Sequence, residues 1–141
     1  MGGSNKSSLH FLMHSHLIAT AIVLKELQIQ SLKSLDDRIL MQRKVYLAQL
    51  KGLPLKYGFS WHLSGPYSED LMEDAIAIVG RDLNDVSLKP EWQHVIDLVN
   101  GLNSNNQWYR PSDWYTKICE ASYKLKTDPR ASKAFKNFMK A

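Results

Sequence analysis

The chain has 141 residues, of which 44% are hydrophobic and 23% are charged, and this is the composition of an ordinary globular domain. Such a composition argues against a disordered chain, a collagen-like rod and a disulfide scaffold. The single cysteine cannot form an internal bridge, which favours a reducing compartment and a cytoplasmic protein.

The net charge of +4 is unevenly distributed along the chain. Residues 1–113 carry eleven basic and twelve acidic side chains, whereas residues 114–141 carry seven basic and two acidic ones. A basic C-terminal segment can attract phosphate or an acidic partner, or it can be the solvated face of a terminal helix. The longest apolar stretch, Leu17–Leu24, is too short to span a bilayer, so we expect no membrane insertion.

Two helices are predicted in the first third of the chain. The first is expected from about Ser8 to Gln30, with apolar residues on more than one face, so it should be largely buried. The second should begin after Ser34, a suitable N-cap, and end at Gly52, with Pro54 just beyond. Its apolar residues fall in two sectors, which predicts the central helix of a small core.

The period changes over residues 57–63, where large apolar residues alternate with small or polar ones. This alternation predicts a half-buried strand. In the turn that follows, Gly65 permits unusual backbone angles and Pro66 fixes one of them. Ser68 is then expected to cap a third helix that ends near Gly80.

Three more helices are predicted toward the C-terminus, after a loop or short strand over residues 81–87. The fourth helix should have Pro90 in its first turn and be followed by a loop over residues 103–107. The fifth is expected to start after Ser112, and the sixth to be capped by Asp128. The sequence therefore predicts a mainly helical fold with a small β element.

Several segments of the chain resemble a known family. Residues 40–47 read LMQRKVYL, residues 55–63 read LKYGFSWHL and residues 65–71 read GPYSEDL. With Asp113-Trp114 and the ASYKL of residues 121–125, they resemble motifs of the uncharacterised YwgA-like bacterial and archaeal proteins. The helix, strand and turn also resemble the Panacea (SocA-like) antitoxin domain. The resemblance implies a compact winged-helix-like fold and a partner-binding role beside a toxin or in a mobile element, with no established reaction.

The motifs of common enzymes do not occur in this sequence. It contains no G-x-S-x-G elbow, no G-x-G-x-x-G and no Walker A loop, so we predict no cofactor. Cys119 falls within a helical pattern, where a buried and inert thiol is expected. His10 and His14 share a predicted helix face, but no third zinc ligand has motif spacing. The first turns of the third helix carry four acids that should be solvated: Glu69, Asp70, Glu73 and Asp74.

Two groups of residues are candidates for binding a protein partner. Tyr67 and Ser68 follow the predicted turn, either as structural residues or as a surface contact presented beside it. Trp108, Tyr109 and Arg110 adjoin a polar loop and belong to the residue types enriched in interface hot spots. The alternative for Trp108 is that it covers the edge of the core. Self-association into a homodimer through the same patch is a further alternative.

A nucleic-acid-binding regulator is the alternative function. The third helix opens with four acids, so it would be a poor recognition helix. Phosphate contacts, non-specific and salt-dependent, would instead come from six basic residues of the C-terminal helices. These residues are Lys124, Lys126, Arg130, Lys133, Lys136 and Lys140.

The sequence thus predicts a single, mainly helical, winged-helix-like domain over residues 8–141. Residues 1–7 are expected to be a disordered start or an expression remnant. The preferred function is a non-catalytic module that binds a protein partner, antitoxin-like or carried by a mobile element, without a metal. A small hydrolase or metal protein is the third hypothesis.

Overall fold

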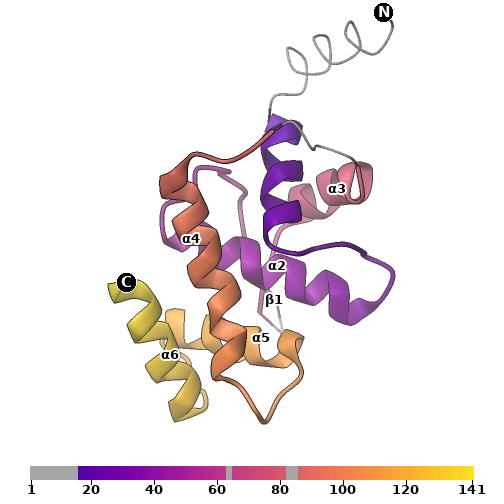
Figure 1. Ribbon diagram of the computed structural model, residues 1–141. Helices are drawn as coiled ribbons and strands as arrows, with labels where there is room; N and C mark the ends of the chain where they lie inside the picture. The colour runs from indigo at the N-terminus through magenta and orange to yellow at the C-terminus, as the bar shows by residue number, and fades with distance from the viewer. Residues whose placement is uncertain (1–15, 63–64, 82–85) are drawn as a thin grey trace, which may run out of the picture.

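The computed structural model describes residues 16–62, 65–81 and 86–141, and over them the fold is mainly helical with one small antiparallel sheet (Figure 1). A helix over residues 16–26 comes first. It is followed by α2 (Leu35–Leu50), β1 (Ser60–His62), β2 (Gly65–Tyr67), α3 (Glu69–Ile78), α4 (Pro90–Gly101), the 3-10 helix η1 (Leu102–Asn105), α5 (Pro111–Ser122) and α6 (Pro129–Lys140). The predicted start over residues 1–7 lies outside the described residues, as do His10 and His14.

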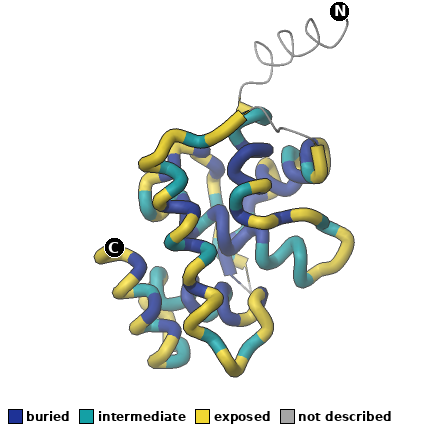
Figure 2. The backbone as a smooth tube through the Cα atoms, in the orientation of Figure 1, coloured by how far each residue is buried: buried dark blue, intermediate teal, exposed yellow. Residues whose placement is uncertain are grey.

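The second helix, α2, crosses the middle of the molecule and contacts α3, α4, α5 and β2 (Figure 1). Its residues 41–45, 47 and 48 are buried, whereas its first turns are partly exposed. The dark stretch at the centre of Figure 2 shows the buried part. This confirms the predicted central helix. Its first apolar sector is buried as predicted, with Met41, Val45 and Ala48 in the core. The second sector is less buried, because Ile39 is partly exposed and Leu50 lies at the surface.

The ends of α2 form as the local sequence predicts. The Ser34 hydroxyl accepts a hydrogen bond from the Asp37 amide at 3.0 Å, and the Asp37 carboxylate accepts one from the Ser34 amide at 3.4 Å. This is a capping box, which satisfies two amides at the start of the helix. At the other end, Gly52 has a φ of +101°, and the amide of Leu53 donates to the carbonyl of Ala48 at 3.1 Å. A glycine in this left-handed conformation closes the helix.

The strand predicted over residues 57–63 is shorter than expected, because pairing covers only Ser60–His62. The antiparallel register places Ser60 opposite Tyr67 and His62 opposite Gly65. Tyr57 does not join this ladder, since both of its backbone polar groups bond to the side chain of Gln49. The aromatic alternation is thus continued without sheet hydrogen bonds.

Three other boundaries differ from the prediction. The first helix ends at residue 26, and Gln28 just beyond it has a left-handed φ of +67°. The carbonyls at this end accept hydrogen bonds from side chains of α2 and α4. Part of the predicted loop over residues 103–107 is the 3-10 turn η1, and α5 begins at Pro111 instead of after Ser112. Within the described residues, no helix is both long and apolar enough to cross a bilayer.

Candidate functional site

Two glutamine side chains of α2 bind the chain on either side of the β-hairpin. The Gln42 amide donates from Nε2 to the Ser68 carbonyl at 2.9 Å, and its Oε1 accepts from the Ser68 amide at 2.9 Å. Gln49, two turns further along, makes the same pair of bonds with Tyr57, at 3.0 and 2.9 Å. The hairpin is therefore held to α2 at both of its ends.

Arg43, between these two glutamines, is only 2% exposed. Its guanidinium donates to the Pro66 carbonyl at 2.7 Å and to the Thr116 hydroxyl at 3.2 Å, so it joins the hairpin to α5. Gly65 packs directly on it, with a φ of +130°, and a Cβ there would lie 2.8 Å from Arg43 Nε. Desolvation lowers the pKa of Arg43, yet an arginine stays charged in proteins.

These contacts show a structural role for the Gly-Pro-Tyr-Ser turn. Ser68 is 1% exposed, and its hydroxyl accepts the Leu71 amide at 3.2 Å, which confirms the predicted cap of α3. The prediction of Ser68 as a surface contact is wrong, because Gln42 and α3 enclose it. Tyr67 is half-buried, and its ring packs edge to face with the His62 ring, with the two centroids 5.2 Å apart.

Lys44 completes the row of buried polar residues on α2. Its Nζ donates to the Leu27 carbonyl at 2.8 Å and to the Asn100 side-chain oxygen at 3.1 Å. Asn100 in turn donates to the Glu26 carbonyl at 2.9 Å. Desolvation lowers the pKa of Lys44 to about 8. The lysine and the asparagine thus satisfy carbonyls at the end of the first helix, a location where positive charge is favourable.

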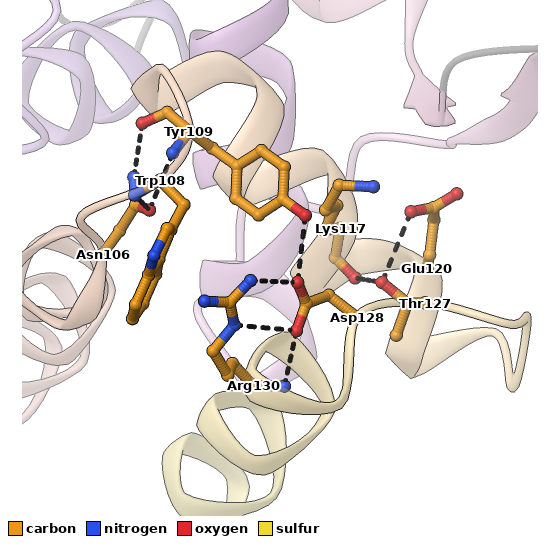
Figure 3. A network of polar contacts seen from close by, with 8 residues as sticks. All are labelled: Asn106, Trp108, Tyr109, Lys117, Glu120, Thr127, Asp128 and Arg130. Carbon is orange, nitrogen blue, oxygen red and sulfur yellow. Dashed lines mark hydrogen bonds and ion pairs between the residues drawn. The ribbon is translucent and has the colours of Figure 1, made fainter.

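A polar and aromatic cluster lies on the loop before α5 and the start of α6 (Figure 3). It brings together Trp108 and Tyr109, predicted to contact a protein partner, and Arg130, predicted to contact nucleic acid. Asp128 accepts two hydrogen bonds from the Arg130 guanidinium, at 3.1 and 2.7 Å, and one from the Tyr109 hydroxyl at 2.9 Å. The Arg130 bonds are the main reason why the pKa of Asp128 is lowered. This fork holds the guanidinium 3.7 Å from the centre of the Trp108 ring system. Trp108 is 55% exposed, so it does not simply cover the core.

The loop that carries Trp108 has a fixed shape. Asn106 Oδ1 accepts the amides of both Trp108 and Tyr109, at 2.9 and 3.0 Å. The Tyr109 ring stacks on Trp114 with centroids 6.1 Å apart. Lys117 Nζ lies 5.0 Å from the centroid of the Tyr109 ring (Figure 3). An exposed indole on such a loop is oriented before any ligand arrives, which lowers the entropy lost on binding.

A groove of about 530 Å³ opens beside this cluster, between α4, η1 and α6. Its apolar lining includes Leu98, Leu102, Trp108, Ala134 and Phe138, and its polar lining includes Asp97, Asn105, Arg130, Lys133 and Asn137. Mostly apolar walls with a few polar groups are typical of binding sites. We therefore take this groove, the α4–α6 groove, as the candidate functional site.

The other predicted residues occupy different positions. Arg110 points away from the groove, since it donates to Asp36 at 2.9 Å and to Asp113 at 3.3 Å. It therefore joins the start of α5 to the start of α2. All six predicted nucleic-acid residues are exposed, and two of them, Arg130 and Lys133, line the groove. Lys124, Lys126, Lys136 and Lys140 are exposed but not among its described lining residues.

A second, more polar cleft of about 490 Å³ contains part of the acidic group of α3. Asp74 accepts the Tyr57 hydroxyl at 2.6 Å, and His16 Nε2 lies 4.0 Å from the same carboxylate. In the described part of the chain, no three histidine, cysteine or acidic side chains come together as a metal site. Cys119 is buried as predicted, and desolvation raises the pKa of its thiol.

Comparison of the chain with protein-family models, curated proteins and solved structures gave no significant match. The resemblance to YwgA-like proteins and to the Panacea domain therefore stays a prediction. The sequence did not reveal the residues whose hydrogen bonds hold the hairpin and the Trp108 loop in place. They are Gln42, Gln49, Asn106 and Asp128. The seven-residue spacing of the two glutamines, which places them on one face of α2, is the signal that could have pointed to them.

Proposed function

We propose that this protein is a non-catalytic binding module whose α4–α6 groove docks an acidic segment of a protein partner. The observation that carries the proposal is the exposed Trp108, held by the Arg130 guanidinium at the edge of an apolar groove. Tryptophan and arginine are the residue types that most often dominate interface energies, and they do so beside apolar pockets. A partner side chain with an apolar tip would fill the groove against Leu102 and Phe138.

The charge around the groove supports an acidic partner. Arg130 and Lys133 line it, and Asp97 is the only acidic residue among its described lining residues. Because Arg130 is paired with Asp128, the excess of positive charge comes from the lysines of α6. The remaining surface of α6 adds Lys136 and Lys140, both exposed. Complementary charge increases the association rate and selects among partners, so aspartate or glutamate beside the apolar anchor is the expected pattern.

Selection from a random peptide display library tests this proposal. Wild-type protein should enrich peptides that combine an aromatic or large aliphatic residue with several acidic ones. Trp108→Ala and Arg130→Glu should each weaken binding of the enriched peptides by about tenfold or more. The control is Tyr123→Ala, which removes an exposed aromatic side chain outside the described groove lining and should leave binding unchanged.

Nucleic acid is the competing ligand, because an exposed aromatic ring among basic side chains can also stack on an unpaired base. A single-stranded oligothymidylate therefore enters the same assay. Binding of this oligonucleotide that weakens steeply with salt, with no peptide enriched, would replace the protein-partner proposal. Light scattering on the same sample tests the homodimer, since a mass equal to one chain at high concentration removes it.

The winged-helix-like fold is part of the proposal, supported by the short antiparallel hairpin that is the next regular element after α2. Neither neighbouring helix is suited to reading DNA, because α2 crosses the core with residues 41–45, 47 and 48 buried, and α3 begins with acidic residues. An antitoxin-like role would make a toxin the source of the docked segment. Co-purification with the product of a neighbouring toxin gene, abolished by Trp108→Ala, is the observation expected in that case.

A further inference from the structure

Both long walls of the α4–α6 groove are helix faces. The lining residues of α6 follow one side of the helix, at Lys133, Ala134, Asn137 and Phe138 among others. They extend from residue 130 to residue 141, which corresponds to about 16 Å along a helix axis. The facing wall follows α4 into η1 in the same way. The groove is therefore about three helical turns long.

The two helices that form these walls are held by different neighbours. The helix α4 packs on α2, whereas α6 packs on α5, and both contact η1. Figure 1 shows α4 and α6 along the same side of the molecule. Two helix faces that border a groove in this way present ridges and grooves of side chains, into which the side chains of a further helix can pack.

The groove has no sheet edge among its described lining residues, since none of them belongs to β1 or β2. The backbone groups of α4 and α6 are bonded within their own helices. An extended segment lying along these walls would turn its amides and carbonyls toward surfaces that cannot pair with them, and a buried backbone group without a partner is costly. A helical segment satisfies these groups internally, so the walls favour a helix.

A row of lysines runs along the α6 side of the groove. Lys133, Lys136 and Lys140 are spaced three and four residues apart, so they share one side of α6, and all three are exposed. Among the described residues, none of these lysines forms an ion pair. Asp97, on the opposite wall, belongs to α4. The positive charge is therefore concentrated on one edge of the groove.

We infer that the segment docked in the α4–α6 groove is an amphipathic α-helix of about three turns, with acidic residues on the flank that faces Lys133, Lys136 and Lys140. This inference rests on the proposed function and adds the conformation and the charge pattern of the partner. Apolar residues that recur every three or four positions enter the groove beside Trp108 and Phe138. The acidic residues recur at the same interval, on one side of that apolar stripe only.

The peptide most enriched by the display selection is the probe for this inference. Its affinity is measured by fluorescence anisotropy in three synthetic forms: unchanged, with proline at a central polar position, and with alanine at that same position. The proline form should bind about tenfold more weakly or not at all, because proline interrupts a helix, whereas the alanine form should bind like the unchanged peptide. Equal affinity of the proline and alanine forms would overturn the inference.

An alanine scan of the same peptide gives an independent measurement. The positions that weaken binding most should lie three or four residues apart. Sensitive positions two residues apart would indicate an extended segment, which would overturn the helix and leave the acidic partner of the proposed function in place. A selection that enriches no peptide would contradict the proposed function itself, and the inference with it.

Charge reversal on α6 tests the orientation of the acidic flank. Lys136→Glu changes an exposed residue outside the described groove lining and should weaken binding of the peptide by about threefold or more. The difference should disappear when the acidic residues of the peptide are replaced by glutamine. The control is Lys33→Glu, which makes the same charge change at an exposed lysine before α2. Wild-type affinity in Lys136→Glu, or an equal loss in the control, would overturn the inference.

Discussion

The side chain of Gln42 satisfies both backbone polar groups of Ser68, with two hydrogen bonds of 2.9 Å. Ser68 follows the last strand of the hairpin and begins α3, so this one amide fixes the junction between the two elements. Gln49 does the same for Tyr57 before the hairpin. The two glutamines differ in burial: Gln42 is fully buried, whereas Gln49 is partly exposed.

This difference predicts unequal effects of two identical substitutions. Gln42→Ala leaves a buried amide and a buried carbonyl of Ser68 without partners, and should lower the free energy of unfolding by about 3 kcal/mol. Gln49→Ala should cost only about 1 kcal/mol, because Gln49 is partly exposed and its two bonds to Tyr57 are only partly buried. Urea unfolding of both variants checks the order. Equal losses would mean that burial does not determine the strength of the pair.

A second prediction concerns the close approach of Gly65 to Arg43. Gly65→Ala places a Cβ 2.8 Å from Arg43 Nε in a left-handed conformation, so the free energy of unfolding should fall by about 2 kcal/mol or more. Gly58→Ala is the matched control, because a Cβ there meets no atom within 4 Å. Thermal unfolding should show a lower midpoint for Gly65→Ala and little change for the control.

The buried Lys44 predicts a rise in stability at alkaline pH. Its pKa is lowered from an ordinary value of 10.5 to about 8 in the folded chain. Between these pH values the unfolded state keeps the proton that the folded state has released, so the free energy of unfolding increases with pH. From about pH 7.5 to about pH 9.5, wild type should gain at least about 1 kcal/mol relative to Lys44→Met. A pH-independent difference would contradict the burial of a charged lysine.

Asp128 predicts a loss of stability at acidic pH. Its pKa is lowered below the ordinary value of 3.8, mainly by the Arg130 guanidinium, so its stabilising effect is present above that pH and is lost as the pH falls. Asp128→Asn keeps a capping side chain but removes the charge. The stability difference between wild type and this variant should therefore shrink below about pH 4. Asp113→Asn, with a longer contact to the exposed Arg110, should show a smaller difference at neutral pH.

Local features of the fold could be predicted from the sequence because their causes are local. Ser34, Ser68 and Asp128 each accept an amide within three residues, and all three act as the predicted helix caps. The mainly helical architecture with its small sheet follows from such signals together with apolar periodicity.

The buried polar row of α2 could not be predicted, because polar residues on a helix ordinarily indicate a solvated face. Their partners come from distant parts of the chain: Arg43 bonds to Thr116, 73 positions away, and Lys44 to Asn100, 56 positions away. No spacing in the sequence reports such pairs. The strand was predicted too long for a related reason, since Gln49 replaces sheet partners at Tyr57.

The candidate site could be predicted only as separate parts. From residue type alone, Trp108 is predicted to contact a protein and Arg130 to contact phosphate. The two residues therefore belong to different predictions, a protein-binding one and a nucleic-acid-binding one. Their contact depends on how α6 packs beside the loop, and on Asp128, which holds the guanidinium in place. Arg110, adjacent to Trp108 in sequence, turns toward α2 instead.

The contacts of Lys44 and Asn100 also bear on the order in which the chain assembles. The carbonyls of Glu26 and Leu27 are satisfied by residues 74 and 17 positions further along the sequence. During synthesis, the opening helix must therefore wait for α4 to emerge before its C-terminal end is complete. Pulse-labelled hydrogen exchange during refolding should accordingly show the helix over residues 16–26 gaining protection late, together with α4.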